Sequence, residues 1–172
     1  MSIAQSLLPE FDQEMANTRK ALEKLPEDKL EWKPDPKSMT LGRLAGHVAE
    51  MPNWAAMTVS TQSLDISPGG KQIFEAMVAT SREQVLAAFD KNVADARKAI
   101  AGVSDQALKE NWRLLANGHE ILNMPRGAVL RSLAMNHMIH HRGQLTVYYR
   151  LVGVAVPGMY GPSADEKQAA AV

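Results

Sequence analysis

The chain has 172 residues and equal numbers of basic and acidic side chains, 19 of each, so its formal net charge is zero. A balanced charge does not produce the strongly positive surface that favours nucleic-acid or membrane binding, so we expect no nucleic-acid partner and no membrane partner. No apolar run approaches the roughly 20 residues that cross a bilayer. The chain contains no cysteine, which excludes disulfides and thiolate ligands. Because its N-terminus lacks a basic signal segment, we expect a cytoplasmic protein.

Apolar residues recur at helical spacing in four long segments. The first segment covers residues 6–25 and leads into a proline-containing connection over residues 26–38. Thr40 is suited to cap a second helix, because its hydroxyl can accept a free backbone N–H of the first turn. The apolar stripe of this second helix includes His47.

The middle of the chain alternates between loops and helices. A loop rich in Gly, Pro and Ser over residues 63–71 precedes a short helix that we expect over residues 72–78. Ser81 then begins a third long helix that ends near Gly102, and Ser104 caps one further turn.

A hairpin and a last helix complete the pattern. Asn117-Gly118 is the sequence of a two-residue type I′ turn, which predicts a small β-hairpin. The last long helix follows over residues 126–152. Four amphipathic helices bury their apolar stripes against one another, so we predict an all-α four-helix bundle with short extra helices. We expect a single domain over residues 1–161 and a frayed tail over residues 162–172.

Three of the five histidines point to a metal site. His137 and His141 are four residues apart, which is about 400° around an α-helix, so they lie one turn apart on one face. His47 lies on the stripe of another helix and is placed to provide a third ligand. His140 flanks the same face as the pair and is an alternative ligand to His141. His119 belongs to the predicted turn and is expected in solvent.

The residues alone leave two interpretations of these histidines. Core histidines that each make one hydrogen bond are common, yet two stacked imidazoles in a core would each need a polar partner and would repel when charged. A divalent metal ion removes both problems. Three neutral imidazoles leave coordination positions open for water or substrate, and they suit Zn, Ni, Fe or Cu without choosing among these metals.

Two polar side chains near the histidines are candidates for a catalytic role. Gln144 lies one turn from His140 and is placed to orient a water molecule or an imidazole. Glu50 follows His47 by three residues, close enough to hydrogen-bond it or to serve as a general base. Gln144 fits equally well as a simple polar residue of the helix, and for Glu50 a solvated helix face is the commoner role.

Three stretches of the sequence carry a resemblance to a known family. LGRLAGHVAEMPNW at residues 41–54 resembles the first signature of the DinB family, and HMIHHRGQL at residues 137–145 resembles its second. The closing VPGMYGPSADE at residues 156–166 is similar to the tail of one branch of that family. The resemblance extends over nearly the whole chain, and the two signatures stand in the family's order.

This resemblance implies a DinB/YfiT-like four-helix bundle, a homodimer, and a divalent metal ion bound by His47, His137 and His141. It also implies a metal-dependent hydrolase acting on a small molecule, or a transferase that adds a low-molecular-weight thiol to an electrophile. Such a thiol must come from a cosubstrate, because the chain has no cysteine. The alternative is a non-catalytic, metal-binding, dimeric stress or scaffold protein, which a fourth protein ligand closing the site would favour.

Overall fold

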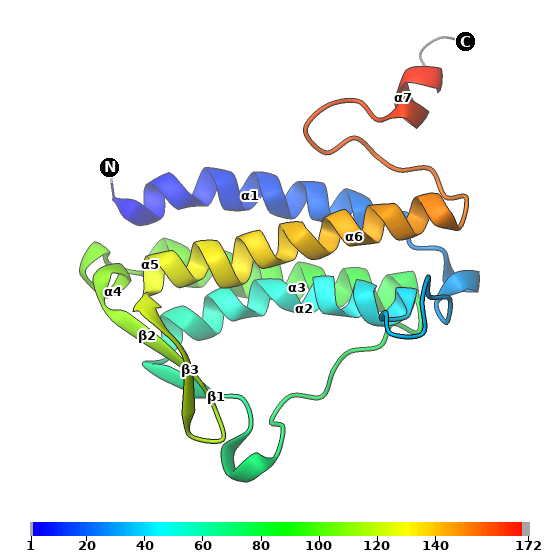
Figure 1. The fold of residues 1–172 in the computed structure, drawn as a ribbon. Helices are drawn as coiled ribbons and strands as arrows, with labels where there is room; N and C mark the ends of the chain where they lie inside the picture. Colours follow the sequence, from blue (N-terminus) through cyan, green and yellow to red (C-terminus); the bar gives the residue numbers. More distant parts are fainter. Residues whose placement is uncertain (1, 170–172) are drawn as a thin grey trace.

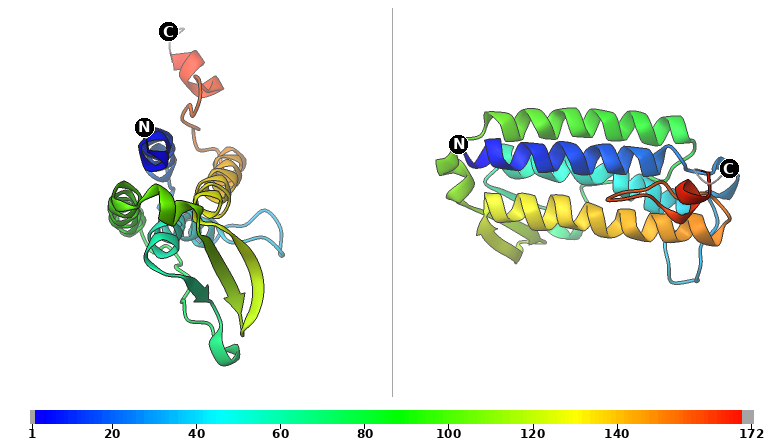
Figure 2. Two further views of the ribbon diagram at one scale, coloured as in Figure 1. Left: turned by 90° about the vertical axis from the view of Figure 1, so that its left-hand side faces the viewer. Right: turned by 90° about the horizontal axis from the view of Figure 1, so that it is seen from above.

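Four long helical segments pack side by side in this computed structural model, which describes residues 2–169 (Figure 1). Seen from above, the four segments run alongside one another as a bundle (Figure 2, right). They are α1 (Ile3–Leu22), α2 (Leu41–Ser60), α3 (Arg82–Gly102) and a final stretch made of α5 (Arg126–Val129), η3 (Leu130–Asn136) and α6 (His137–Leu151). The predicted all-α four-helix bundle is therefore confirmed. None of the described helices is long and apolar enough to cross a membrane.

Three of the expected helix caps are confirmed. The hydroxyls of Thr40, Ser81 and Ser104 each accept a backbone N–H from the first turn of α2, α3 and the short helix α4 (Asp105–Lys109). The first helix begins at Ile3, earlier than expected, because a capping box precedes it. A single turn of 3₁₀-helix, η1 (Glu27–Lys29), follows in the connection to α2.

The predicted hairpin is present, but it belongs to a larger sheet. Strands β2 (Asn111–Ala116) and β3 (His119–Pro125) pair antiparallel on either side of Asn117 and Gly118, whose φ angles of 51° and 78° suit a type I′ turn. A strand that the sequence pattern missed, β1 (Ser63–Asp65), pairs in parallel with β2. The sheet has the order β1-β2-β3 and projects from one side of the bundle (Figure 2, left).

The buried stripe of α6 differs from the apolar stripe that helical spacing predicts, which runs through Leu130, Ala134, His137, His141, Gln144, Tyr148 and Leu151. The side chains that α6 buries in the core are Met138, Arg142, Leu145 and Tyr149. His137 and His141 lie on the neighbouring face and are only half-buried. The π-helical η3 explains the difference, because its wider turn shifts the phase of the residues that follow. The histidines therefore stand at the edge of the core, where ligands can reach them.

Residues 71–80 form an extended segment that lies along α2, so the short helix expected over residues 72–78 is wrong. The backbone N–H of Ala79 donates to the carbonyl of Gly42 at 3.1 Å. Gly46 permits the close approach, because a Cβ atom there would lie 2.3 Å from a carbonyl oxygen of the segment. The segment is thus held in place by its hydrogen bond and packing contacts with α2, and not by a regular helix within the segment. It is preceded by one turn of 3₁₀-helix, η2 (Pro68–Gly70).

A buried ion pair between α1 and α6 holds Tyr160, and through it the chain after α6, against the bundle. Arg142 and Glu14 approach within 2.7 Å, and the hydroxyl of Tyr160 donates to the same carboxylate at 2.9 Å. The short helix α7 (Ala164–Ala169) stands apart from the four-helix bundle in Figure 1. The expected frayed tail over residues 162–172 falls partly outside the described residues.

Candidate metal centre

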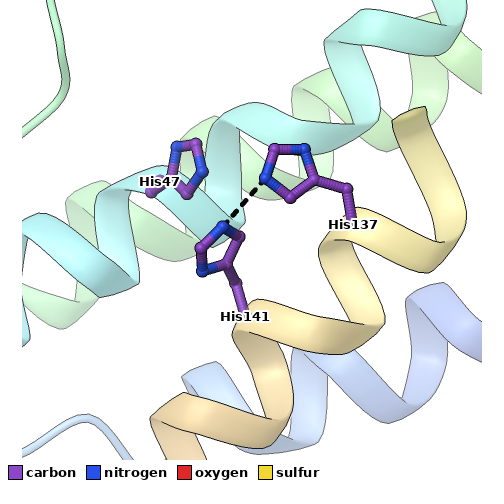
Figure 3. Close-up of side chains that lie close together, drawn as sticks. All are labelled: His47, His137 and His141. Carbon is purple, nitrogen blue, oxygen red and sulfur yellow. Dashed lines mark hydrogen bonds between the residues drawn. The ribbon is translucent and has the colours of Figure 1, made fainter. Parts of the chain in front are cut away.

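Three histidines meet between α2 and α6 (Figure 3). His47 projects from α2, and His137 and His141 project from successive turns of α6. One ring nitrogen of each lies within 4.8 Å of the others. The ring centroid of His47 is 5.4 Å from that of His137 and 4.5 Å from that of His141. The three residues that the sequence selected as ligands therefore form one cluster.

A hydrogen bond determines which ring nitrogen of His141 is free. Nδ1 of His141 lies 2.7 Å from Oε1 of Gln144, an oxygen that can only accept, so we assign the proton of His141 to Nδ1. His141 then presents the lone pair of its Nε2 to His137, whose Nε2 lies 2.9 Å away. A proton on Nε2 of His137, or a cation between the two rings, satisfies this contact.

Burial keeps both α6 histidines neutral. Desolvation is the largest cause that lowers the pKa of His141, to about 4, and it also lowers the pKa of His137 below its ordinary value. Positive charge on the neighbouring histidines lowers both pKa values further, whereas the hydrogen bond to Gln144 acts in the opposite direction on His141. At pH 7 both rings are therefore neutral imidazoles, the form that binds metal ions.

Glu50 connects His47 with the 71–80 segment. Its Oε2 lies 3.8 Å from Nδ1 of His47 and 3.2 Å from Nη1 of Arg43, while its Oε1 accepts the backbone N–H of Met77 at 2.6 Å. Partial burial raises the pKa of this carboxyl, but its contacts with His47, Met77 and Arg43 together hold the pKa below its ordinary value. Glu50 is therefore a fixed carboxylate at neutral pH, well placed to orient the His47 ring.

The donor set fits a divalent transition metal ion. Imidazole nitrogens bind Zn at about 2.0–2.1 Å, so two nitrogens on one ion are separated by at most about 4.2 Å. The facing Nε2 atoms of His137 and His141, 2.9 Å apart, are within this limit, and one ring nitrogen of His47 lies within 4.8 Å of a ring nitrogen of each. Among the described residues, no fourth His, Asp or Glu side chain joins the group. The residues present would thus hold an ion without closing its coordination shell.

The remaining histidines lie outside the cluster. His140, the alternative ligand, is exposed, and its ring centroid is 4.9 Å from that of His141. His119 is exposed at the start of β3, where the sequence placed it.

Sequence reasoning missed the segment beside the site and the role of Arg43 in holding Glu50. A signal for the segment was present in the sequence. Gly42 and Gly46 are four residues apart and leave a strip of α2 without side chains, on which another part of the chain can lie.

A pocket of about 300 Å³ opens beside His47. Side chains of α2, of α3 and of the 71–80 segment contribute to its walls. The apolar lining comes from Met51, Trp54, Met57, Ile66 and Phe74. Because His47 is itself part of the wall, the pocket reaches the histidine cluster.

The protein is a four-helix bundle with a cluster of three histidines, drawn from two of its helices, beside a pocket. The chain belongs to the DinB family, whose family model matches residues 1–170. A relative with 31% identity over 166 residues is the uncharacterized protein YrdA of Bacillus subtilis (strain 168). That match covers 92% of this chain and 89% of the relative.

Two solved structures share the fold. A DinB-like protein from Bacillus cereus ATCC 10987 is 28% identical with a TM-score of 0.67, and the match covers 91% of this chain and 97% of that protein. A DinB-like protein from Bacillus subtilis, YjoA, is 21% identical with a TM-score of 0.66, over 92% of this chain and 99% of that protein. At 21% identity, the similarity to YjoA establishes a shared fold and nothing more.

Proposed function

We propose that the protein is a metal-dependent enzyme that acts on a small molecule at the three-histidine cluster, as a hydrolase or as a thiol-dependent transferase. The observation that carries this proposal is the cluster of three histidines, in which one ring nitrogen of each lies within 4.8 Å of the others and the Nε2 atoms of His137 and His141 are 2.9 Å apart. The absence of a fourth protein ligand among the described residues and the pocket at His47 favour a site that is open to substrate.

A bound Zn, Ni, Fe or Cu ion would supply a Lewis acid that lowers the pKa of a water molecule or stabilises a thiolate. The surrounding side chains act as positioning residues for the imidazoles. Gln144 retains the Nδ1 proton of His141 and so directs its Nε2 towards the centre. Glu50 lies 3.8 Å from Nδ1 of His47, longer than a hydrogen bond but close enough to bias the ring electrostatically, and is itself held by Arg43. A thiol, if one is used, is a cosubstrate, because the chain has no cysteine.

The proposal is tested first by metal content. Protein purified without a histidine tag is analysed for bound elements, alongside the variants His47→Ala, His137→Ala and His141→Ala. We expect the parent protein to contain one transition metal ion per chain and each variant to lose it. His140→Ala is the matched control, because it removes a neighbouring exposed imidazole and should retain the ion. Full metal retention in the three ligand variants would contradict the assignment.

Activity is tested next with an ester-hydrolysis screen and a screen that combines a low-molecular-weight thiol with an electrophile. We expect turnover that a chelator abolishes and that the added metal restores. Turnover that requires the thiol identifies a transferase, and turnover without it identifies a hydrolase. Stoichiometric metal with no turnover in either screen would refute the enzyme proposal and favour the non-catalytic metal-binding protein.

A further inference from the structure

The pocket beside His47 has a composition that selects among substrates. We propose that it binds a single uncharged aromatic ring of a substrate that also carries a polar hydrogen-bonding group. This inference rests on the proposed function, because it names the substrate class of the same site.

An aromatic wall is the first argument. The ring centroids of Trp54 and Phe74 are 6.2 Å apart and their planes are inclined by 58°, which is the spacing of a favourable aromatic pair. Phe74 is nevertheless 43% exposed, so one face of the pair is left for a further ring. Met51 and Met57 line the same pocket, and thioether sulfurs make favourable contacts with aromatic rings.

The charges around the pocket are the second argument. Arg43 is the only Lys or Arg among the described lining residues, and it is paired with Glu50 at 3.2 Å. Glu75, an exposed lining residue, adds a further negative charge. Away from the three-histidine cluster, a phosphate or carboxylate in the pocket would therefore meet no free Lys or Arg among the described lining residues and would face a like charge. This part of the pocket favours an uncharged group.

A polar anchor and the size of the pocket narrow the class further. Asn92 lines the pocket, and its Nδ2 donates one proton to the carbonyl of Ala49 at 2.9 Å, so its Oδ1 can accept a hydrogen bond from a ligand and its second Nδ2 proton can donate one. The volume of about 300 Å³ lies at the lower end of the range for small-molecule sites. One ring with a short polar substituent fits such a pocket better than a peptide or a fused polycycle.

The test uses benzyl alcohol as the aromatic probe and cyclohexanemethanol as an aliphatic probe with the same polar group. Saturation-transfer NMR on the full-length, metal-loaded protein gives the affinities. We expect benzyl alcohol to bind more tightly, and Phe74→Ala to weaken its binding by about three- to tenfold. Ile73→Ala is the matched control, because Ile73 is similarly exposed on the same segment but lies outside the pocket lining, and it should leave the affinity unchanged.

Equal affinities for the two probes, or equal losses in the two variants, would overturn the inference. Metal content and turnover measured on the same samples separate it from the proposed function. If turnover depends on the three histidines while benzyl alcohol does not bind, only the aromatic-substrate inference fails. If Phe74→Ala weakens probe binding but the protein neither holds metal nor turns over, the proposed function fails and the substrate assignment falls with it.

Discussion

Replacing Gln144 with alanine tests whether this side chain positions His141 to bind a cation. Its amide oxygen accepts the Nδ1 proton of His141 at 2.7 Å, and this leaves Nε2 unprotonated and directed towards His137. Without this acceptor the imidazole is free to adopt the other tautomer, in which Nε2 carries the proton and is blocked. Gln144→Ala should therefore weaken metal binding without removing a ligand.

The size of the effect follows from the exposure of the hydrogen bond. Partners of this kind typically contribute tenfold to a hundredfold to metal affinity. Gln144 is exposed, so water can replace its amide as the acceptor. We therefore expect the lower end of that range, a loss of about tenfold in metal affinity, or about 1.4 kcal/mol.

Competition with a chromophoric chelator at pH 7 measures this affinity. Gln144→Glu should bind the metal at least as tightly as the parent protein, because a carboxylate is a stronger acceptor than an amide. His140→Ala should bind it with unchanged affinity. The reasoning is refuted if Gln144→Ala binds the metal as tightly as the parent, or if His140→Ala weakens binding as much.

Three further predictions concern pH, helix packing and the buried ion pair. The pKa of about 4 for His141 predicts that this imidazole stays unprotonated at pH 5 in the metal-free protein, where an imidazole of pKa 6.5 would be about 97% protonated, as an NMR titration of its ring protons would show. In the metal-free protein the unfolded state binds more protons between pH 6.5 and about 4, so the free energy of unfolding should fall as the pH falls through that window. In urea denaturation, Gly46→Ala should be destabilising, because its Cβ would lie 2.3 Å from a backbone oxygen, whereas Gly143→Ala, with no neighbour within 4 Å, should stabilise the protein by about 1 kcal/mol. Arg142→Met should cost about 3–5 kcal/mol because it leaves Glu14 buried without its partner, and the double variant Glu14→Leu/Arg142→Met should recover most of that loss.

Elements with local contacts were predictable from the sequence. The caps at Thr40 and Ser81 act within one helical turn, and the Asn117-Gly118 turn is specified by its own two residues. Strand β1 and the extended 71–80 segment were missed because their hydrogen-bond partners lie on other elements, β2 and α2. A window of sequence contains no information about such partners.

The candidate site likewise has features that local spacing predicts and features that depend on tertiary contacts. The i, i+4 spacing places His137 and His141 on one helix face whatever the rest of the chain does. Their position beside the core instead of within it depends on η3, which a regular helical period does not anticipate. The position of Glu50 between His47 and the 71–80 segment required the tertiary structure. The homodimer, the cytoplasmic location and the identity of the metal stay predictions.

The two oxygens of Glu50 serve different neighbours, and this division has a thermodynamic consequence. One oxygen faces His47, and the other holds the backbone of Met77 in the segment that forms a wall of the pocket. If the cluster binds an ion as proposed, a ligand that displaces this segment would also move the carboxylate that faces His47. Linkage would make the effect reciprocal, so that the ligand and the ion would change each other's affinity by the same factor. Ion binding and ligand binding would then be coupled equilibria, joined through a single carboxylate.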